Sequence, residues 1–140
     1  VEGLEPAFHD RNPSPSPNEK YLAYMARVKD EQTGKINNFV RVVELNDGVA
    51  GKKVLEINGD RVPRIRWTPD SSSIVFERES GNRDLFKIDI ASKQETQISE
   101  FDTNMDTADF VWSQDGTKIL LFKTTVLSGI VRIKDTSLAN

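Results

Sequence analysis

The sequence predicts an all-β chain of the β-propeller type, with about three four-stranded antiparallel blades. The first observation is an internal repeat: residues 66–77 (RWTPDSSSIVFE) nearly recur as residues 111–122 (VWSQDGTKILLF), and their tryptophans stand 45 residues apart. A looser copy lies at residues 16–24 (SPNEKYLAY). A period of about 40–45 residues with four strands per unit is typical of propeller blades. The second observation is a set of short apolar runs, which fit strands covered on both faces.

Composition narrows the classes of function. A chain of 140 residues suffices for one domain, here 1–140, with blades at about 10–60, 61–101 and 105–140. The net charge of −3 favours no nucleic-acid partner, and the apolar runs are too short for membrane insertion. The absence of cysteine excludes disulfides and thiolate catalysis. The chain starts at Val1 without a signal-peptide pattern, which favours a piece of a longer protein and leaves the compartment undetermined.

The first blade is the least regular of the three. Residues 12–17 (NPSPSP) are rich in proline, which cannot donate to a strand ladder, so they predict a poor strand or an edge strand. Residues 4–9 are either a first strand with a stretched turn or the last strand of a preceding blade. The following strands are predicted at 21–25, 40–45 and 53–57.

The second and third blades follow one pattern. In the second blade, strands are predicted at 64–67, 74–76, 86–90 and 95–98, with Pro69 fixing the first corner of the turn. In the third, strands at 109–112, 119–122 and 130–135 flank a hairpin turn at Asp115 and Gly116. The third copy stops near its third strand, so we expect the N-terminus of this or another chain to supply the fourth.

Seven extra residues separate the second and third strands of the first copy, within the polar segment 29–38 (KDEQTGKINN). A surface insertion without function is one interpretation, because insertions in loops cost little free energy. Binding residues also concentrate on such loops. Together with the inter-blade loops 58–61 and 102–106, which should emerge on the same face, this loop predicts a protein-binding surface. Its residues are Lys29, Lys35, Asn37, Asn58, Asp60, Arg61, Asp102, Asn104 and Asp106.

No cluster of residues predicts catalysis, a cofactor or a metal. His9 is the single histidine, and no nucleophile motif accompanies it. Asp102, Asn104 and Asp106 have the spacing of the first ligands of a calcium loop, but Thr107 and Ser113 stand where glycine and glutamate are required. A looser calcium site that includes Asp109 remains an alternative. The chain is therefore expected not to be an enzyme.

Three further groups of residues have structural interpretations. Trp67 and Trp112 occupy matched repeat positions and are expected to pack between blades. The charged residues around the turn 80–82 are expected to form a solvated hairpin. They are Glu77, Arg78, Glu79, Arg83 and Asp84. The basic residues Arg61, Arg64 and Arg66 are expected to form one polar strand face rather than an anion site.

The repeat resembles the TolB-type β-propeller family, which is related to the WD-type repeats. Its units read approximately as aromatic-Ser-Pro-Asp-Gly, a short apolar strand, and Asp-Leu-aromatic-x-Ile-Asp. The closest copy is Trp67-Thr68-Pro69-Asp70 with residues 84–89 (DLFKID); the second, 112–116 (WSQDG), has Gln114 in place of the proline. The resemblance covers about residues 12–135, and it implies a periplasmic or other extracytoplasmic location.

The resemblance implies a non-catalytic scaffold for protein–protein interaction. The alternatives are the propeller portion of a larger hydrolase, similar to prolyl oligopeptidase, or of a lyase, and a carbohydrate-binding propeller. Propellers usually close with 4–8 blades, so three blades would leave apolar flanks exposed. Either the chain belongs to a larger propeller, or a homodimer completes a six-bladed ring.

Overall fold

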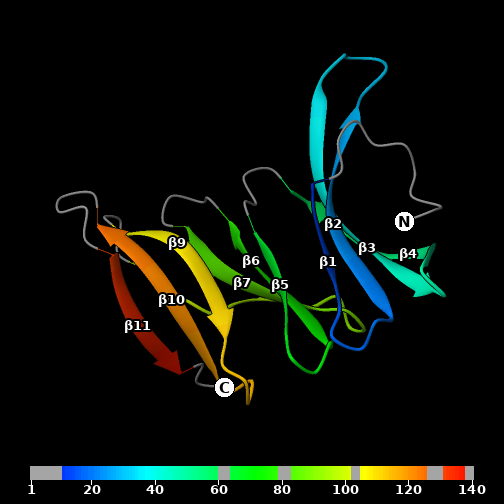
Figure 1. Cartoon of the computed structure of the whole chain (residues 1–140). Coiled ribbons are helices and arrows are strands. Elements are labelled where there is room, and N and C mark those ends of the chain that lie inside the picture. The colour runs from blue at the N-terminus through cyan, green and yellow to red at the C-terminus, as the bar shows by residue number, and fades with distance from the viewer. Residues whose placement is uncertain (1–10, 60–63, 79–82, 102–104, 126–130, 138–140) are drawn as a thin grey trace.

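The computed structural model describes residues 11–59, 64–78, 83–101, 105–125 and 131–137, and these residues form three antiparallel sheets that lie side by side in chain order (Figure 1). The first sheet contains β1 (Arg11–Pro15), β2 (Tyr21–Lys29), β3 (Ile36–Asn46) and β4 (Val49–Asn58). The second contains β5 (Ile65–Trp67), β6 (Ser73–Arg78), β7 (Asp84–Asp89) and β8 (Glu95–Gln97). The third contains β9 (Met105–Trp112), β10 (Lys118–Thr125) and β11 (Val131–Ser137).

This architecture confirms the predicted all-β, propeller-type fold. Each sheet is a meander in which sequential strands pair. Two sheets have four strands, and the third has three among the described residues, as expected for a copy that stops near its third strand. No helix in the described part of the chain is long and apolar enough to cross a membrane.

Side-chain alternation in the second sheet explains why its inner strand, β6, contains a continuous apolar run. Ile74 and Phe76 pack toward the first sheet, together with Trp67. Val75 and Leu85 pack toward the third sheet. Ile74, Val75 and Phe76 are all fully buried. A strand that is covered on both faces needs apolar residues on both, so its sequence is a continuous apolar run, as at residues 74–76.

The turn that opens each inner hairpin is built three times from the same hydrogen bond. A Ser or Thr hydroxyl donates to the side-chain Oδ1 two residues later, at 2.7, 2.6 and 2.6 Å in the three sheets. The pairs are Ser16 with Asn18, Thr68 with Asp70, and Ser113 with Asp115. The following residue has a positive φ in every copy. Such side-chain bonds fix a turn locally, so the sequence motif recurs with the turn.

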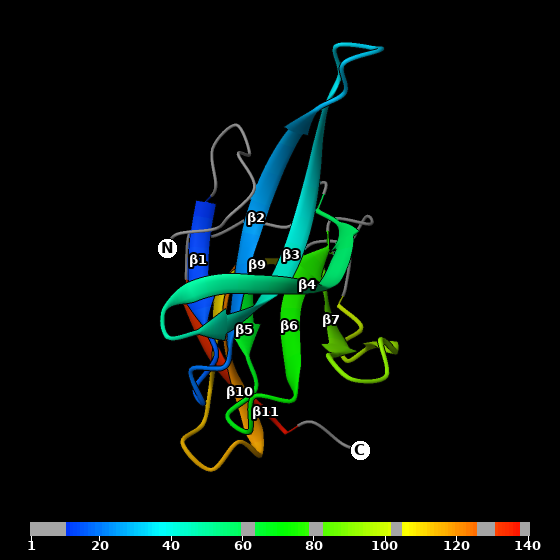
Figure 2. The same cartoon turned by 90° about the vertical axis from the view of Figure 1, so that its right-hand side faces the viewer.

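The seven extra residues of the first copy lengthen the hairpin and do not form a long loop, so the prediction of a loop at 29–38 was wrong in this respect. Cross-strand pairing between β2 and β3 continues out to Lys29 opposite Ile36. The turn is then closed by Asp30, whose Oδ1 accepts from the Thr33 amide at 3.1 Å, and by Gly34 at a φ of 70°. The resulting arm, β2–β3 with its turn, extends beyond the other described strands (Figures 1 and 2).

The first strand is the proline-rich segment itself. It runs from Arg11 to Pro15 at the edge of the first sheet, with a register shift between Arg11 and Ser14. Proline is tolerated there because an edge strand needs only one row of ladder bonds. The alternative first strand at 4–9 lies outside the described residues.

Candidate functional site

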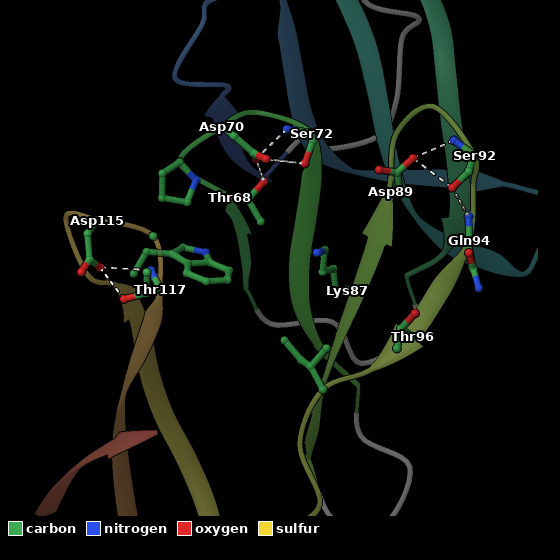
Figure 3. A pocket seen from close by; sticks show the side chains of 14 residues that line it. Thr68, Asp70, Ser72, Lys87, Asp89, Ser92, Gln94, Thr96, Asp115 and Thr117 are labelled. Carbon is green, nitrogen blue, oxygen red and sulfur yellow. Dashed lines mark hydrogen bonds between the residues drawn. The ribbon is translucent and has the colours of Figure 1, made fainter. Parts of the chain in front are cut away.

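A cavity of about 710 Å³ lies between the second and third sheets, and we call it the inter-blade recess. Its volume falls in the range that small-molecule sites of proteins occupy, roughly 300–1,000 Å³. Trp112 and the turn 113–117 form one side, and β7, β8 and the turn 68–72 form the other. Figure 3 shows Asp115 and Thr117 on one side, Asp89 and Ser92 on the other, and Lys87 between them.

Three turns place carboxylates around the recess, and each turn stabilises the ionised form. Hydrogen bonds from Thr68 and Ser72 lower the pKa of Asp70, and the backbone and hydroxyl of Ser92 lower the pKa of Asp89. The hydroxyl of Ser113, with the backbone and hydroxyl of Thr117, lowers the pKa of Asp115 to about 2. The Lys87 ammonium contributes to the lowered pKa of both Asp70 and Asp89. At neutral pH the recess therefore carries three carboxylates against one ammonium.

The two tryptophans differ in their hydrogen bonding although both occupy the predicted inter-blade positions. Trp67 is buried, its ring is stacked on Tyr21 at a centroid distance of 6.0 Å, and its Nε1 donates to the Ser14 carbonyl oxygen at 2.7 Å. Trp112 packs partly against the second core cluster. Its Nε1 is shielded from solvent and has no hydrogen-bond partner among the described residues. The packing prediction is confirmed, and Trp112 additionally faces the recess.

An ion-pair network crosses the same interface away from the recess. Arg64 lies 3.7 Å from the fully buried Glu77 and 3.5 Å from Asp109, and Arg66 lies 3.3 Å from Asp109. Both arginines therefore pair with Asp109 of the third sheet. This favours the predicted polar strand face over an anion-binding site. Arg61 lies outside the described residues.

The predicted solvated hairpin at 77–84 is only partly correct. Glu77 and Asp84 are buried, and Asp84 accepts hydrogen bonds from the Ser99 hydroxyl at 3.0 Å and the Phe101 amide at 2.9 Å. Arg78 lies over the Phe86 ring at 4.8 Å, and it also pairs with Glu95. Strand alternation explains the error, because Glu77 stands on the face that the third sheet covers. Glu79 lies outside the described residues.

The structure describes only some of the residues that were predicted to bind a protein partner. Lys29 and Lys35 are exposed near the tip of the arm, and Asn37 is half-buried in β3. Asn58 ends β4 opposite Phe39, beside the base of the arm. Asp106 lies in β9, and its backbone pairs with Thr124. Asp60, Arg61, Asp102 and Asn104 lie outside the described residues. The arm and the end of β4 thus come together, and a common surface for all nine residues stays a prediction.

The remaining site predictions are untested. Among the described residues, no three His, Cys, Asp or Glu side chains gather where they could hold a metal ion. The calcium-like segment begins at Asp102 and Asn104, which are outside the described part, and so is His9. Sequence reasoning missed the recess. The signal that could have revealed it is Lys87, which lines the recess and stands where the first copy carries the buried Val42.

No known protein family matches the chain, and no curated protein matches it. Solved structures do match. A puromycin-hydrolyzing peptidase of Mycobacterium tuberculosis superposes with a TM-score of 0.69 at 15% identity, over 96% of this chain and 21% of that one. An acylaminoacyl peptidase of Pyrococcus horikoshii gives 0.61 at 14% identity, over 92% and 25%. The β-propeller domain of the Trilobed protease from Pyrococcus furiosus gives 0.60 at 16% identity, over 95% and 45%.

These matches show that the fold is of the β-propeller class. The assignment to the TolB-type family remains an expectation from the sequence. The chain spans between about a fifth and a quarter of the two peptidases named above. The prediction that the chain is not an enzyme is contradicted, since the solved structures that it resembles include peptidases, which are several times longer than this chain.

Proposed function

We propose that this chain is the propeller portion of a larger hydrolase of the peptidase class. The observation that carries the proposal is the match of 96% of this chain to 21% of a puromycin-hydrolyzing peptidase. In this role the blades form a rigid β framework beside a catalytic part that another segment supplies. The chain itself contributes shape and contacts rather than reacting groups.

The arm is the element best placed to contact the catalytic part. It extends past the ends of the other described strands, and its tip presents the exposed Lys29 and Lys35 (Figure 2). Its base is held by the Gly59 amide, which donates to the Asn38 carbonyl oxygen at 2.8 Å. A long hairpin on a packed sheet can therefore carry contact residues without disturbing the core. This also gives the predicted residues Lys29, Lys35 and Asn37 a partner.

The test uses the complete reading frame that contains this segment. We expect the frame to encode a hydrolase-like part, and its product to hydrolyse aminoacyl and short-peptide chromogenic substrates. The variant Lys29→Ala/Lys35→Ala/Asn37→Ala should lower the rate on longer peptides several-fold without lowering the melting temperature. The control Lys20→Ala/Lys52→Ala removes the same number of exposed charges at the opposite end of the sheet and should change neither.

Two results would overturn the proposal. One is a reading frame that encodes only further blades. The other is a folded product that hydrolyses no substrate of the panel. An equal loss of activity and stability in the arm variant would instead show that the arm is structural.

A further inference from the structure

Three turns or strand ends of the chain carry an aspartate or asparagine directly before a glycine. The pairs are Asp47-Gly48, Asn58-Gly59 and Asp115-Gly116. In such a pair the glycine nitrogen can attack the side-chain carbonyl carbon of the residue before it, because glycine has no side chain to hinder the approach. The attack needs a free glycine amide, a free side chain, and a backbone that can leave its native dihedral angles. The structure meets these conditions at the first pair and not at the other two.

Asp47 and Gly48 form the two-residue turn between β3 and β4, with Asn46 paired to Val49 on either side of them. Both turn residues have a positive φ, 52° and 79°, as such a hairpin turn requires. Residues 46–49 are all exposed, and a Cβ built on Gly48 would meet no atom within 4 Å. Among the described residues, neither the Asp47 carboxylate nor the Gly48 amide makes a hydrogen bond. Both reacting groups of this pair are therefore free.

The pair Asn58-Gly59 is held in place at the base of the arm. The Gly59 amide donates to the Asn38 carbonyl oxygen at 2.8 Å, and Gly59 is buried. A Cβ on Gly59 would lie 2.7 Å from the carbonyl carbon of Phe39, so the two backbones are in close contact. An attack on Asn58 would have to break this hydrogen bond and move Gly59 away from β3, which makes local opening costly.

The pair Asp115-Gly116 is fixed by hydrogen bonds, although Asp115 is as exposed as Asp47. Oδ1 of Asp115 accepts from the Ser113 hydroxyl at 2.6 Å and from the Thr117 amide at 3.0 Å. The Gly116 amide donates to the Ser113 carbonyl oxygen at 2.9 Å. The bonds from Ser113 and Thr117 also lower the pKa of Asp115 to about 2, which keeps the carboxyl ionised, whereas the attack requires its neutral form. Both reacting groups of this pair are therefore engaged in the turn.

We propose that Asp47 is a site of spontaneous isomerisation to isoaspartate, whereas Asn58 and Asp115 are protected from the same chemistry. The Gly48 nitrogen forms a bond to Cγ of Asp47, the Cγ–OH bond breaks, and the hydroxyl leaves as water with the amide proton. The succinimide ring that results takes up one water. Cleavage of its Cγ–N bond restores aspartate. Cleavage between the nitrogen and the main-chain carbonyl carbon gives isoaspartate, with no net change in mass.

The turn has to open for this step, because the Gly48 nitrogen must swing toward the Asp47 side chain. Opening separates the end pair Asn46–Val49, and Val49 is already 44% exposed, so little buried area is lost. Isoaspartate adds one methylene to the main chain of a two-residue turn and should weaken this end pair. The site is independent of the proposed function, because the turn lies at the end of β3 and the arm at its start.

The test compares the three pairs in the full folded chain with the same pairs in the chain unfolded in guanidinium chloride. Both samples are incubated for weeks in heavy-oxygen water, and peptide mapping measures the label at each pair, because every ring hydrolysis incorporates one water oxygen. Folding should slow the labelling of Asp47 by no more than about tenfold, since turn tips open at little cost in free energy. It should slow labelling at Asn58 and Asp115 by at least about a hundredfold, since hydrogen bonds must break first. Loss of cleavage before residue 47 by an aspartate-specific protease identifies the isoaspartate.

Two variants test the cause of the difference. Ser113→Ala removes a hydroxyl that holds Asp115, and should raise the labelling of Asp115 several-fold while that of Asp47 is unchanged. If this variant does not fold, Thr117→Ala provides the same test, because the Thr117 hydroxyl also donates to Oδ1 of Asp115. Asp47→Asn retains a residue that suits the turn, and should release ammonia with a gain of about one mass unit.

Three results would overturn the proposal. One is an unlabelled Asp47 in the folded chain while the unfolded chain takes up label there. Another is a folded chain in which Asn58 and Asp115 are slowed no more than Asp47. The third is unchanged labelling of Asp115 in a folded variant that lacks one of its hydroxyl donors, which would show that the turn bonds are not the protection.

Discussion

Trp67 Nε1 donates a hydrogen bond of 2.7 Å to the carbonyl oxygen of Ser14, and thereby joins the first strand of the second sheet to the first strand of the first. These residues are 53 apart in sequence. The edge strand β1 has few partners of its own, because its prolines donate no ladder bonds. The indole therefore anchors a strand that its own sheet holds weakly.

This relationship predicts different costs for the same substitution at the two tryptophans. Trp67→Phe should lower the free energy of unfolding by about 1–3 kcal/mol, because it leaves the Ser14 carbonyl unpaired and removes ring area. Trp112→Phe removes an N–H that has no partner among the described residues, and should cost less than about 1 kcal/mol. Urea denaturation of both variants measures the difference. Equal costs would show that the bond to Ser14 contributes little.

The repeated turns predict a stability that falls in acid. Because the folded-state pKa of Asp115 is lowered to about 2 from 3.8, its ionised turn contributes stability that is fully present above about pH 4 and is lost as the pH falls toward 2. Asp70 and Asp89 act in the same direction. Asp115→Asn should make the urea midpoint less dependent on pH in this window. Asn18 already accepts the same hydrogen bonds in the first sheet, so the variant should fold.

The ion-pair network predicts that Arg64 matters more than Arg66. Arg64 contacts both Glu77 and Asp109, whereas Arg66 pairs with Asp109 alone. Removing a partner of a buried carboxylate takes away part of the compensation of its charge. Arg64→Ala should cost about 1–3 kcal/mol, and Arg66→Ala, a partly exposed pair, about 0.2–1 kcal/mol. The reverse order in chemical denaturation would show that the Arg64–Glu77 contact is not stabilising.

The outer flank of the third sheet predicts self-association of the isolated 140-residue chain. Val75 is fully buried against the third sheet, whereas its repeat counterpart Leu120 is only half-buried, and the adjacent Val111 is 38% exposed. We propose that a second copy covers this flank, as in a six-bladed ring. Light scattering should then give a mass near twice 15.8 kDa. Val111→Lys should restore the monomer, and Ala91→Lys, at an exposed position in the middle sheet, should not.

The inner strands were predictable from their apolar runs. The run at 74–76 lies in β6 and is covered on both faces, and the run at 119–122 lies in β10, where Leu120 on the outer flank is only half-buried. The turns were predictable because their hydrogen bonds are local. The polar contacts between sheets were not. Glu77 follows an apolar run and precedes a charged turn, and only the strand alternation shows that it faces the third sheet.

The arm and the recess were missed for two different physical reasons. The polar segment 29–38 lacks an apolar pattern, so its extended part could not be told from a loop. Cross-strand pairing, which composition does not encode, sets the length of the arm. The recess is lined by Lys87, which is inconspicuous because polar and apolar residues alternate in this strand. It stands out only when the repeat equates it with the buried Val42 of the first sheet.

The indole of Trp67 stacks on Tyr21 of β2 and donates to Ser14 of β1, so one side chain of the second sheet contacts two strands of the first. The ladder hydrogen bonds of each sheet do not involve this ring. Shortening the side chain should therefore loosen the angle between the two blades while each blade keeps its own pairing.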